Sequence, residues 1–423
     1  MKILWFTIDC PQLYSANRNY NGGGWIRSLL EHFSKNYPLC TIGYAFPHLT
    51  ETSVRQVGNI IYMPLHQKKA SYLSKLLNYW HIKNDDDYFL CKEEMLKAIK
   101  AFQPDIIQIF GIEHGLASIV EEINIPTIIH LQGLLIPYNN AFFPNGINLL
   151  SFKRHGNFLH EWIIRNGWIF RKKQIARGAK HEQRRFKSVK YVSGRTEWDY
   201  QLSQLYAPDA KYFFINECLR PIFYQKQMGN DSLANNKITI VSTLSETLYK
   251  GLDLILKTAS LMKNELKIDF VWKIIGIKEQ SSFIHFFERT YKINSEDNNI
   301  KYLGVLNEIE LKKQLCLATV FVHPSYIDNS PNSVCEAQIT GIPVIACNTG
   351  GVSSLIHHKI TGILIPTNDP YGLAYWIKHL STHTEFRRQI SIKAQKIASE
   401  RHNPVSICES LMKCYTEILS QQK

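Results

Sequence analysis

The chain has 423 residues, of which 45% are hydrophobic and 20% are charged. This composition is that of a soluble globular protein, and the length predicts two domains, because single cores rarely grow so large. The formal net charge of +13 indicates an anionic partner: a nucleic acid, an anionic membrane surface or a phosphorylated ligand.

The nine cysteines are scattered, with no CxxC pair and no metal-type spacing. We expect reduced, buried thiols in a cytosolic protein rather than a disulfide framework. The first residues lead directly into a short apolar strand, so no signal peptide is expected. No apolar run approaches the roughly 20 residues that a membrane span needs.

Strand and helix patterns alternate through the first half of the chain, which predicts a parallel sheet with helices on both faces. The predicted strands are 3–8, 40–46, 59–65, 105–110, 127–131, 191–194 and 212–215, and the predicted helices are 25–33, 88–102, 113–123 and 196–205.

Three features of this half invite a functional interpretation. Gly22, Gly23 and Gly24 precede a predicted helix, where they either bring the backbone close to an anion or merely turn the chain. His130 ends a predicted strand on the ligand side of the sheet, and a core histidine is the alternative. The acidic run 85–87 precedes a helix, so we interpret it as a solvated cap rather than a metal site.

The stretch from Lys153 to Lys190 is basic and aromatic. It holds twelve Lys or Arg residues against two Glu, with Phe, Trp and Ile interleaved. Such a stretch can lie on an anionic membrane or contact a phosphate-bearing acceptor, and a basic outer face of packed helices is the alternative.

The polar segment 225–237 is the best linker, and a second alternating set follows it. Its predicted strands are 238–244, 270–276, 300–304 and 319–323, and its predicted helices are 252–262, 283–291 and 308–317. We therefore predict an N-terminal domain, 1–224, and a C-terminal domain, 237–402, with a last helix within 403–423 returning to the first domain.

The second set leads into His323 to Gly351, where a strand, a polar loop, a helix and a strand form a βαβ unit. Asp328 and Glu336 lie eight positions apart in this unit. Loops at the carboxyl ends of parallel strands bind ligands in open α/β sheets, so a ligand site is predicted around these two carboxylates.

This pattern resembles the retaining glycosyltransferases of family four, which have the GT-B fold. The matching steps are Pro324-Ser325, Asp328, Pro331-Asn332, Glu336-Ala337, Gly341, Pro343 to Ala346 and Gly350-Gly351. The resemblance is close over about residues 238–366 and reaches the first half through the order of elements, the glycine loop and His130. It implies an α/β protein of two facing Rossmann-like doubly wound domains with a cleft between them.

The resemblance also implies roles for individual residues. Glu336 would accept the ribose hydroxyls of a nucleotide sugar, Asp328 would accept sugar hydroxyls, and Lys250 would neutralise the leaving diphosphate. The implied catalytic residues are His130, Asp328 and Lys250, and the implied donor-binding residues are Gly22, Gly23, Gly24, Thr243, Lys250, Asn329, Ser330, Asn332, Ser333 and Glu336. No metal or cofactor is expected beyond the nucleoside diphosphate sugar.

Two departures from the family pattern stand out. Asp328 is one methylene shorter than the usual Glu, which bears on donor-sugar selectivity. Ser242 and Thr243 lie where a phosphate-binding Arg is usual, and a neutral hydroxyl cannot replace a guanidinium. Arg195 and Arg220 are candidates to replace it.

The resulting hypothesis is a retaining glycosyltransferase that moves a sugar to a hydroxyl, plausibly of a lipid-linked oligosaccharide in capsule, O-antigen or exopolysaccharide assembly. It would work in the cytoplasm or peripherally at the inner face of the cytoplasmic membrane, and no nucleic acid is expected as a partner. The alternative is a catalytically weak sugar-nucleotide-binding or scaffolding subunit. Epimerases and phosphorylases also use the GT-B fold, which therefore does not decide between them.

Overall fold

The structure is a computed structural model that describes residues 1–14, 24–67, 91–155, 167–225 and 237–421. Its contacts divide the chain into two compact units. Unit 1 comprises residues 1–136, 178–218 and 403–423, and unit 2 comprises residues 137–177 and 219–402.

This division corrects the predicted domains in two places, the shorter of which is residues 219–224, expected in the N-terminal domain but grouped with unit 2. Residues 137–177 were expected in the N-terminal domain, and they group with unit 2. Phe152 of this segment is 1% exposed and stacks on Phe286 at 4.9 Å between ring centroids. The segment therefore contributes apolar side chains to the core of unit 2, and this burial outweighs its position in the sequence. Most of the predicted linker, residues 226–236, lies outside the described residues.

Unit 1 contains an eight-stranded sheet in the order β3-β4-β2-β1-β5-β6-β7-β8. All neighbouring strands are parallel except β3, which pairs antiparallel with β4. The strands are β1 (Lys2–Phe6), β2 (Thr41–His48), β3 (Arg55–Val57), β4 (Ile60–His66), β5 (Ile106–Phe110), β6 (Thr127–His130), β7 (Tyr191–Gly194) and β8 (Lys211–Phe214).

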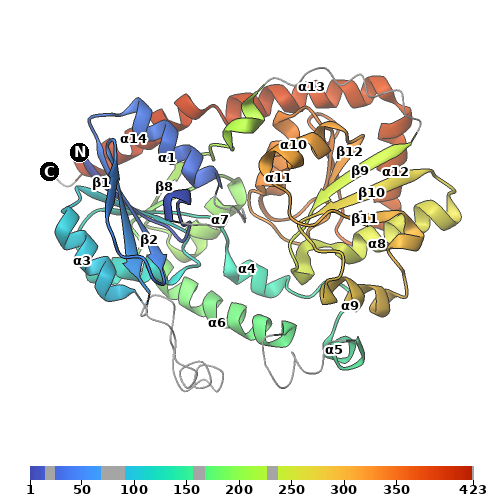
Figure 1. Cartoon of the computed structure of the whole chain (residues 1–423), viewed down its shortest axis with the longest axis horizontal. Helices are drawn as coiled ribbons and strands as arrows, with labels where there is room; N and C mark the ends of the chain where they lie inside the picture. The colour runs from blue at the N-terminus through green and yellow to red at the C-terminus, as the bar shows by residue number, and fades with distance from the viewer. Residues whose placement is uncertain (15–23, 68–90, 156–166, 226–236, 422–423) are drawn as a thin grey trace. The chain divides into compact units, whose positions relative to one another are not determined.

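Helices cover both faces of this sheet (Figure 1). They are α1 (Gly24–Asn36), α3 (Lys92–Phe102), α7 (Glu197–Tyr206), α14 (Pro404–Ser420) and the part of α6 (Trp168–Phe186) from residue 178 onward. A 3-10 helix, Gly115–Glu122, lies where an α-helix was predicted.

Successive side chains of β1 point to opposite faces of the sheet and enter the two different cores of unit 1. Ile3 and Trp5 face the core that includes α1 and α14, whereas Leu4 and Phe6 face the opposite core. The indole N–H of Trp5 donates to the Tyr415 hydroxyl at 2.9 Å, and that hydroxyl donates to Gln108. These contacts place α14 in unit 1.

Unit 2 contains a six-stranded parallel sheet in the order β11-β10-β9-β12-β13-β14. The strands are β9 (Ile238–Thr243), β10 (Phe270–Ile275), β11 (Ile300–Tyr302), β12 (Val320–His323), β13 (Val344–Cys347) and β14 (Ile363–Ile365). In chain order within the unit this arrangement is 3-2-1-4-5-6, the order of a Rossmann fold.

Two further cores cover the faces of this second sheet. The helices are α5 (Leu149–His155), α8 (Leu252–Ser260), α9 (Ser282–Tyr291), α10 (Glu308–Cys316), α11 (Asn332–Ile339), α12 (Pro370–Thr382) and α13 (Thr384–Arg401). Helix α4 (Leu135–Asn140) spans the boundary in the sequence where unit 1 ends at residue 136 and unit 2 begins at residue 137. Among the helices of the described ranges, none has the length and apolar composition to span a membrane.

Candidate functional site

The predicted donor residues of unit 2 lie at the point where its strand order reverses. β9 and β12 are neighbours there although they are the first and fourth strands of the unit. Lys250 follows β9 and Asp328 follows β12, so both lie beyond the carboxyl ends of the strands. Ligands bind at such switch points in open α/β sheets.

A close backbone approach holds these two loops together. Gly251 has a φ of +82°, and a Cβ atom there would lie 2.1 Å from the carbonyl oxygen of Pro324. Only glycine fits this position without displacing the backbone. The Tyr326 N–H donates to the Tyr249 carbonyl at 2.8 Å, which ties the loops together a second time. Lys250 is thereby brought beside the loop of Asp328.

The carboxylate of Asp328 is buried among donors. Lys250 Nζ donates to Oδ2 at 2.6 Å, and His323 Nε2 lies 3.1 Å from the same oxygen. The Asn329 N–H donates to Oδ1 at 3.2 Å. Burial alone would raise the pKa of Asp328, but Lys250 and His323 outweigh it and hold that pKa well below its ordinary value. Asp328 is therefore ionised at neutral pH.

Tyr138 also reaches this carboxylate, a contact that was not predicted. Its hydroxyl donates to Asp328 Oδ1 at 3.5 Å, and its ring lies 5.3 Å from the ring of Tyr249. Tyr138 is on α4, 190 positions before Asp328, and no residue pattern connects the two. His323 was likewise predicted only as the last residue of a strand, with no role in the site.

Glu336 lies on α11 and forms an ion pair with Arg220. Arg220 Nε and Nη2 donate to Glu336 Oε1 at 3.0 and 2.8 Å. Burial raises the pKa of Glu336, and Arg220 opposes that rise. Arg220 is therefore the candidate cation that lies in the donor-site unit, whereas Arg195 lies in unit 1.

The residues before Glu336 form the loop and the first turn of α11. Asn329 and Ser330 are 1% and 7% exposed, and α11 begins at Asn332. The N–H groups of Asn332 and Ser333, in that first turn, lack intrahelical acceptors and are the ones that could bind an anion. Their predicted contacts with a donor remain predictions.

Ser242 and Thr243 have different surroundings. The Ser242 hydroxyl donates to the Val322 carbonyl at 2.8 Å and accepts from the Trp272 indole at 3.0 Å. It is a fully buried structural hydroxyl between β9 and its neighbours. Thr243 ends β9 and is half-buried, and its predicted donor contact remains a prediction.

His130 belongs to unit 1 and ends β6. Its Nδ1 lies 3.0 Å from the Ser193 hydroxyl, and its ring lies 5.1 Å from the ring of Trp25. The buried Nε2 has no hydrogen-bond partner among the described residues. Burial, with Arg195 nearby, lowers the pKa of His130 to about 3, so the imidazole is neutral at pH 7. Nε2 thus retains the capacity for one hydrogen bond to a ligand.

The lowered pKa of His130 predicts a pH-dependent stability. Its ordinary value is 6.5, so below that pH the unfolded chain binds one more proton than the folded chain. The free energy of unfolding should therefore fall by about 1.4 kcal/mol per pH unit between pH 6.5 and 4 through this group. His130→Gln should remove this component in urea unfolding at pH 7, 6 and 5. His285→Gln, at an exposed position, is the control, and an unchanged slope in His130→Gln would contradict the prediction.

The glycine loop before α1 is only partly described. Gly24 is buried at the first residue of α1, and Gly22 and Gly23 lie outside the described residues, as does the acidic run 85–87. The predicted contact of the three glycines with the donor therefore remains a prediction.

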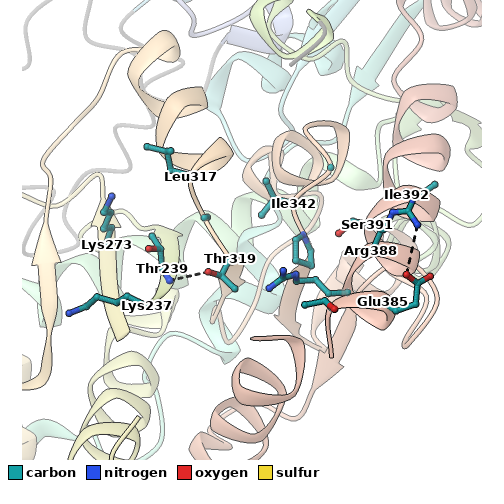
Figure 2. A pocket seen from close by; sticks show the side chains of 15 residues that line it. Lys237, Thr239, Lys273, Leu317, Thr319, Ile342, Glu385, Arg388, Ser391 and Ile392 are labelled. Carbon is teal, nitrogen blue, oxygen red and sulfur yellow. Dashed lines mark hydrogen bonds and ion pairs between the residues drawn. The ribbon is translucent and has the colours of Figure 1, made fainter. Parts of the chain in front are cut away.

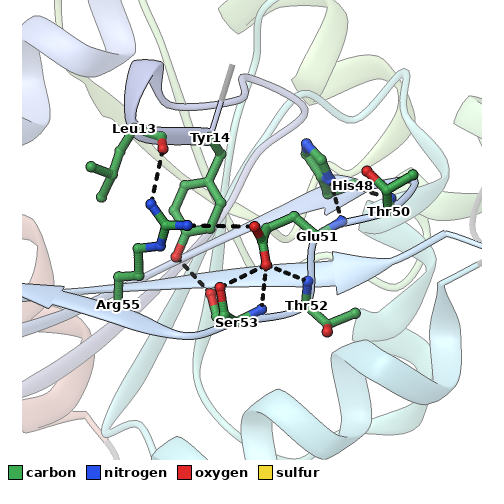
Figure 3. A network of polar contacts seen from close by, with 8 residues as sticks. All are labelled: Leu13, Tyr14, His48, Thr50, Glu51, Thr52, Ser53 and Arg55. Atoms are coloured by element: carbon green, nitrogen blue, oxygen red, sulfur yellow. Dashed lines mark hydrogen bonds and ion pairs between the residues drawn. The ribbon is translucent and has the colours of Figure 1, made fainter. Parts of the chain in front are cut away.

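Two loops at the carboxyl edge of the unit 1 sheet are fixed by polar contacts (Figure 3). Glu51 Oε1 accepts the N–H groups of Thr52 and Ser53 at 3.1 and 3.0 Å. Arg55 donates to the Leu13 carbonyl at 3.3 Å, and its guanidinium carbon lies 4.8 Å from the ring of Tyr14. These contacts connect the segment after β1 with the segment after β2. Apolar side chains remain exposed there, namely Leu13 (46%), Leu49 (49%) and Val54 (59%).

Some side chains of the basic stretch 153–190 pack on, or hydrogen-bond with, other residues of unit 2. Trp168 lies 5.4 Å from the ring of Phe283, and Arg171 covers Trp168 with its guanidinium carbon 4.5 Å from the ring. Lys172 Nζ donates to Asn139 Oδ1 at 2.9 Å. These described side chains favour the packed-helix interpretation for the start of α6, and residues 156–166 lie outside the described ranges.

A pocket of about 730 Å³ lies at the opposite, amino edge of the unit 2 sheet (Figure 2). Four basic side chains line it, and each forms a hydrogen bond or an ion pair with another residue. Lys237 pairs with Asp269 at 3.0 Å, and Lys273 donates to Gln314 at 2.9 Å. Two arginines lie at the start of α13. Arg387 donates to the Leu380 carbonyl at 3.3 Å, and Arg388 pairs with the carboxylate of Glu385 at 3.8 Å. No predicted site residue lines this pocket, so we assign it no role.

Two solved structures share the fold of the whole chain. A sucrose-phosphate synthase from Thermosynechococcus elongatus is similar with a TM-score of 0.71 over 99% of both chains, at 13% sequence identity. Anabaena HepE in complex with UDP and glucose is similar with a TM-score of 0.62 over 98% of this chain and 99% of that chain, at 16% identity. These likenesses confirm the predicted GT-B fold class with its two Rossmann-like units.

The sequence of the C-terminal half is similar to a known family. Residues 225–397 match the family model described as Glycosyl transferases group 1. A curated relative is the UDP-Gal:alpha-D-GlcNAc-diphosphoundecaprenol alpha-1,3-galactosyltransferase of Escherichia coli. It is 33% identical over 113 residues, which are 26% of this chain and 27% of that protein. The first curated relatives are matched over only 21–45% of their own length.

Proposed function

We propose that the protein is a retaining glycosyltransferase that moves a sugar from a nucleoside diphosphate sugar to an acceptor hydroxyl. The observation that carries this proposal is the Lys250–Asp328 pair, 2.6 Å long, at the strand-order reversal of a unit that matches the glycosyltransferase family model. The pair offers a cation for a leaving diphosphate and a carboxylate for sugar hydroxyls.

The proposed reaction uses the donor's own phosphate as the base. The acceptor oxygen forms a bond to the anomeric carbon while the bond from that carbon to the phosphate oxygen breaks on the same face. The diphosphate leaves with the electron pair and takes the acceptor hydroxyl proton. When the donor binds, Lys250 leaves Asp328 and pairs with the diphosphate. Asp328 Oδ2 can then accept a hydrogen bond from the sugar. No protein nucleophile and no metal are needed in this scheme.

The proposed acceptor is a lipid-linked oligosaccharide in bacterial surface-polysaccharide assembly. The Escherichia coli relative is named for a diphosphoundecaprenol-linked acceptor, which supports this choice. The exposed Leu13, Leu49 and Val54 of unit 1 offer apolar surface to such a molecule. Action in the cytoplasm, at the inner face of the cytoplasmic membrane, is part of the proposal.

A thermal-shift panel followed by a transfer assay tests the proposal. UDP, GDP, ADP and their sugar conjugates are added to the full chain, and the stabilising donor is then incubated with lipid-linked acceptors from bacterial membranes. We expect stabilisation by one nucleotide class and transfer that is independent of EDTA. Stabilisation by none of these nucleotides would contradict the proposal.

A catalytically weak sugar-nucleotide-binding subunit is the second candidate. The structural role of the Ser242 hydroxyl favours it, because this part of β9 supplies no cation to a diphosphate. Nucleotide binding without transfer to any membrane extract would support this candidate. A nucleic-acid partner would require affinity for duplex or single strands, which we do not expect.

Tyr138→Phe tests whether the new contact to Asp328 serves transfer. The bond of 3.5 Å is long, so we expect kcat/KM to fall by only about 3–10-fold. Tyr138→Ala should lose more, because the ring also packs on Tyr249. Tyr302→Phe, which removes a hydroxyl bonded to Ser295 at 2.9 Å, is the matched control and should leave transfer unchanged. Equal effects of Tyr138→Phe and Tyr302→Phe would rule out a specific role.

A further inference from the structure

Arg220 is held rigidly within unit 2 by the segment that follows it. The 3-10 helix Pro221–Tyr224 begins directly after Arg220. The Tyr224 hydroxyl donates to the His402 carbonyl at 2.7 Å and accepts the Leu219 N–H at 2.9 Å. Lys312 Nζ donates to the carbonyls of Ile222 and Gln225 at 2.7 and 2.9 Å. The backbone that carries Arg220 is therefore anchored on both sides.

The guanidinium of Arg220 is fixed as well as its backbone. Its central carbon lies 4.9 Å from the ring of Phe223, a buried core residue. The side chain of Arg220 is 12% exposed and that of Glu336 is 7% exposed. A planar guanidinium held by a ring and a carboxylate has little freedom left, which is the condition for orienting a partner.

The two bonds to Glu336 converge on one oxygen. Both Nε and Nη2 of Arg220 donate to Oε1, so this ion pair does not use Oε2. An ionised carboxylate can accept about four hydrogen bonds. The pair therefore orients Glu336 and leaves its second oxygen for another donor.

Arg220 also opposes the effect of burial. Glu336 lies where burial favours the neutral acid, and the adjacent guanidinium favours the carboxylate. A carboxylate accepts hydrogen bonds from hydroxyl groups more strongly than a neutral acid does. Loss of Arg220 would thus remove the orientation of Glu336 and shift its pKa further upward.

We infer that Arg220 is a positioning residue for nucleotide recognition, which holds the Glu336 side chain oriented so that Oε2 accepts the ribose hydroxyls of the donor. The inference rests on the proposed function and adds a residue from outside the family-like stretch. In this arrangement Arg220 affects binding of the ribose hydroxyls through Glu336. It does not itself bind the diphosphate.

Ribose discrimination is the measurement that separates positioning from general structure. Affinities of UDP, GDP and ADP are compared with those of their 2′,3′-dideoxy forms by calorimetry on the full chain at pH 7. For the wild type we expect loss of the two hydroxyls to weaken binding by about 100-fold. Arg220→Ala should bind the parent nucleotide about 10–100-fold more weakly and should discriminate less than about fivefold. Arg220→Lys keeps the charge and should be intermediate.

The pH dependence gives a second readout. Without Arg220, Glu336 ionises at a higher pH, so nucleotide affinity of Arg220→Ala should rise from pH 6 to pH 9. The affinity of Glu336→Gln should not change through this group over the same range. Arg401→Ala is the matched control, because Arg401 donates to the backbone carbonyls of Leu355 and Ser354, at 3.4 and 3.2 Å, and not to a carboxylate among the bonds of the described residues.

The outcomes are distinct. Wild-type discrimination retained by a folded Arg220→Ala or by Arg220→Lys would overturn the inference and leave the proposed function standing. Failure of the wild type to bind any of the nucleotides would overturn the proposed function and this inference with it. If Arg220→Ala does not fold, Arg220→Lys decides, because a bidentate guanidinium is lost while the charge stays.

Discussion

Replacing Lys250 by methionine is expected to lower the rate of sugar transfer by about 10²–10³-fold, because its ammonium group would stabilise the leaving diphosphate. The structure also predicts a cost in stability. Asp328 keeps His323 but loses the 2.6 Å bond from Lys250, and the free energy of unfolding should fall by about 1–3 kcal/mol. Transfer assays with the donor from the nucleotide panel and urea unfolding measure the two effects.

Lys257→Met is the matched control for the Lys250 variant. Lys257 is 23% exposed and pairs with Asp253 at 3.0 Å, much as Lys250 is 22% exposed and pairs with Asp328. It should lose stability with little loss of rate. In the double variant Lys250→Met/Asp328→Asn, stability should partly return while transfer stays low. A Lys250→Met enzyme with a rate near that of the wild type would remove Lys250 from the site.

Asp328→Asn is expected to lower the free energy of unfolding at pH 7 by about 2–3 kcal/mol. This is below the range for fully buried pairs, because Lys250 is 22% exposed and can turn to solvent. Transfer should fall by about 100-fold, since an amide accepts sugar hydroxyl bonds less strongly than a carboxylate. Urea unfolding and transfer assays measure the two effects.

The stability difference between the wild type and Asp328→Asn should depend on pH in a defined direction. The folded pKa of Asp328 lies below its ordinary value of 3.8, so the carboxylate stabilises the fold above about pH 4. That stabilisation is lost as the pH falls toward the folded pKa. The difference should thus be constant from pH 8 to 5 and shrink below pH 4. Asp269→Asn removes an exposed surface pair and should change stability by less than about 0.5 kcal/mol at pH 5–8.

Much of the fold could be predicted from local patterns. Buried parallel strands are short apolar runs, and those predicted at 238–244 and 319–323 correspond to β9 and β12. The edge strands β3 and β14, of three residues each, were missed, whereas the equally short β11 lies within the predicted strand 300–304. The assignment of 137–177 to unit 2 was also missed, since it depends on packing rather than on local sequence.

The candidate site shows the same limit. Asp328 could be named in advance because it follows an apolar strand, and Lys250 because the resemblance to the family implied it; the structure brings them together. Tyr138 and Arg220 could not, because they lie 190 and 116 positions from the carboxylates they contact. Only the three-dimensional contacts show that Arg220, rather than Arg195, is adjacent to the family-like helix.

The contact between Trp5 and Tyr415 bears on how the protein is made. During translation β1 leaves the ribosome long before α14, which follows only after the whole of unit 2. Until then the face of the sheet that carries Ile3 and Trp5 lacks one of its two covering helices. Both segments of unit 2, residues 137–177 and 219–402, precede α14 in the chain, so unit 2 can fold before unit 1 is complete. The nascent chain therefore presents an apolar surface for most of its synthesis, which is where a chaperone would bind.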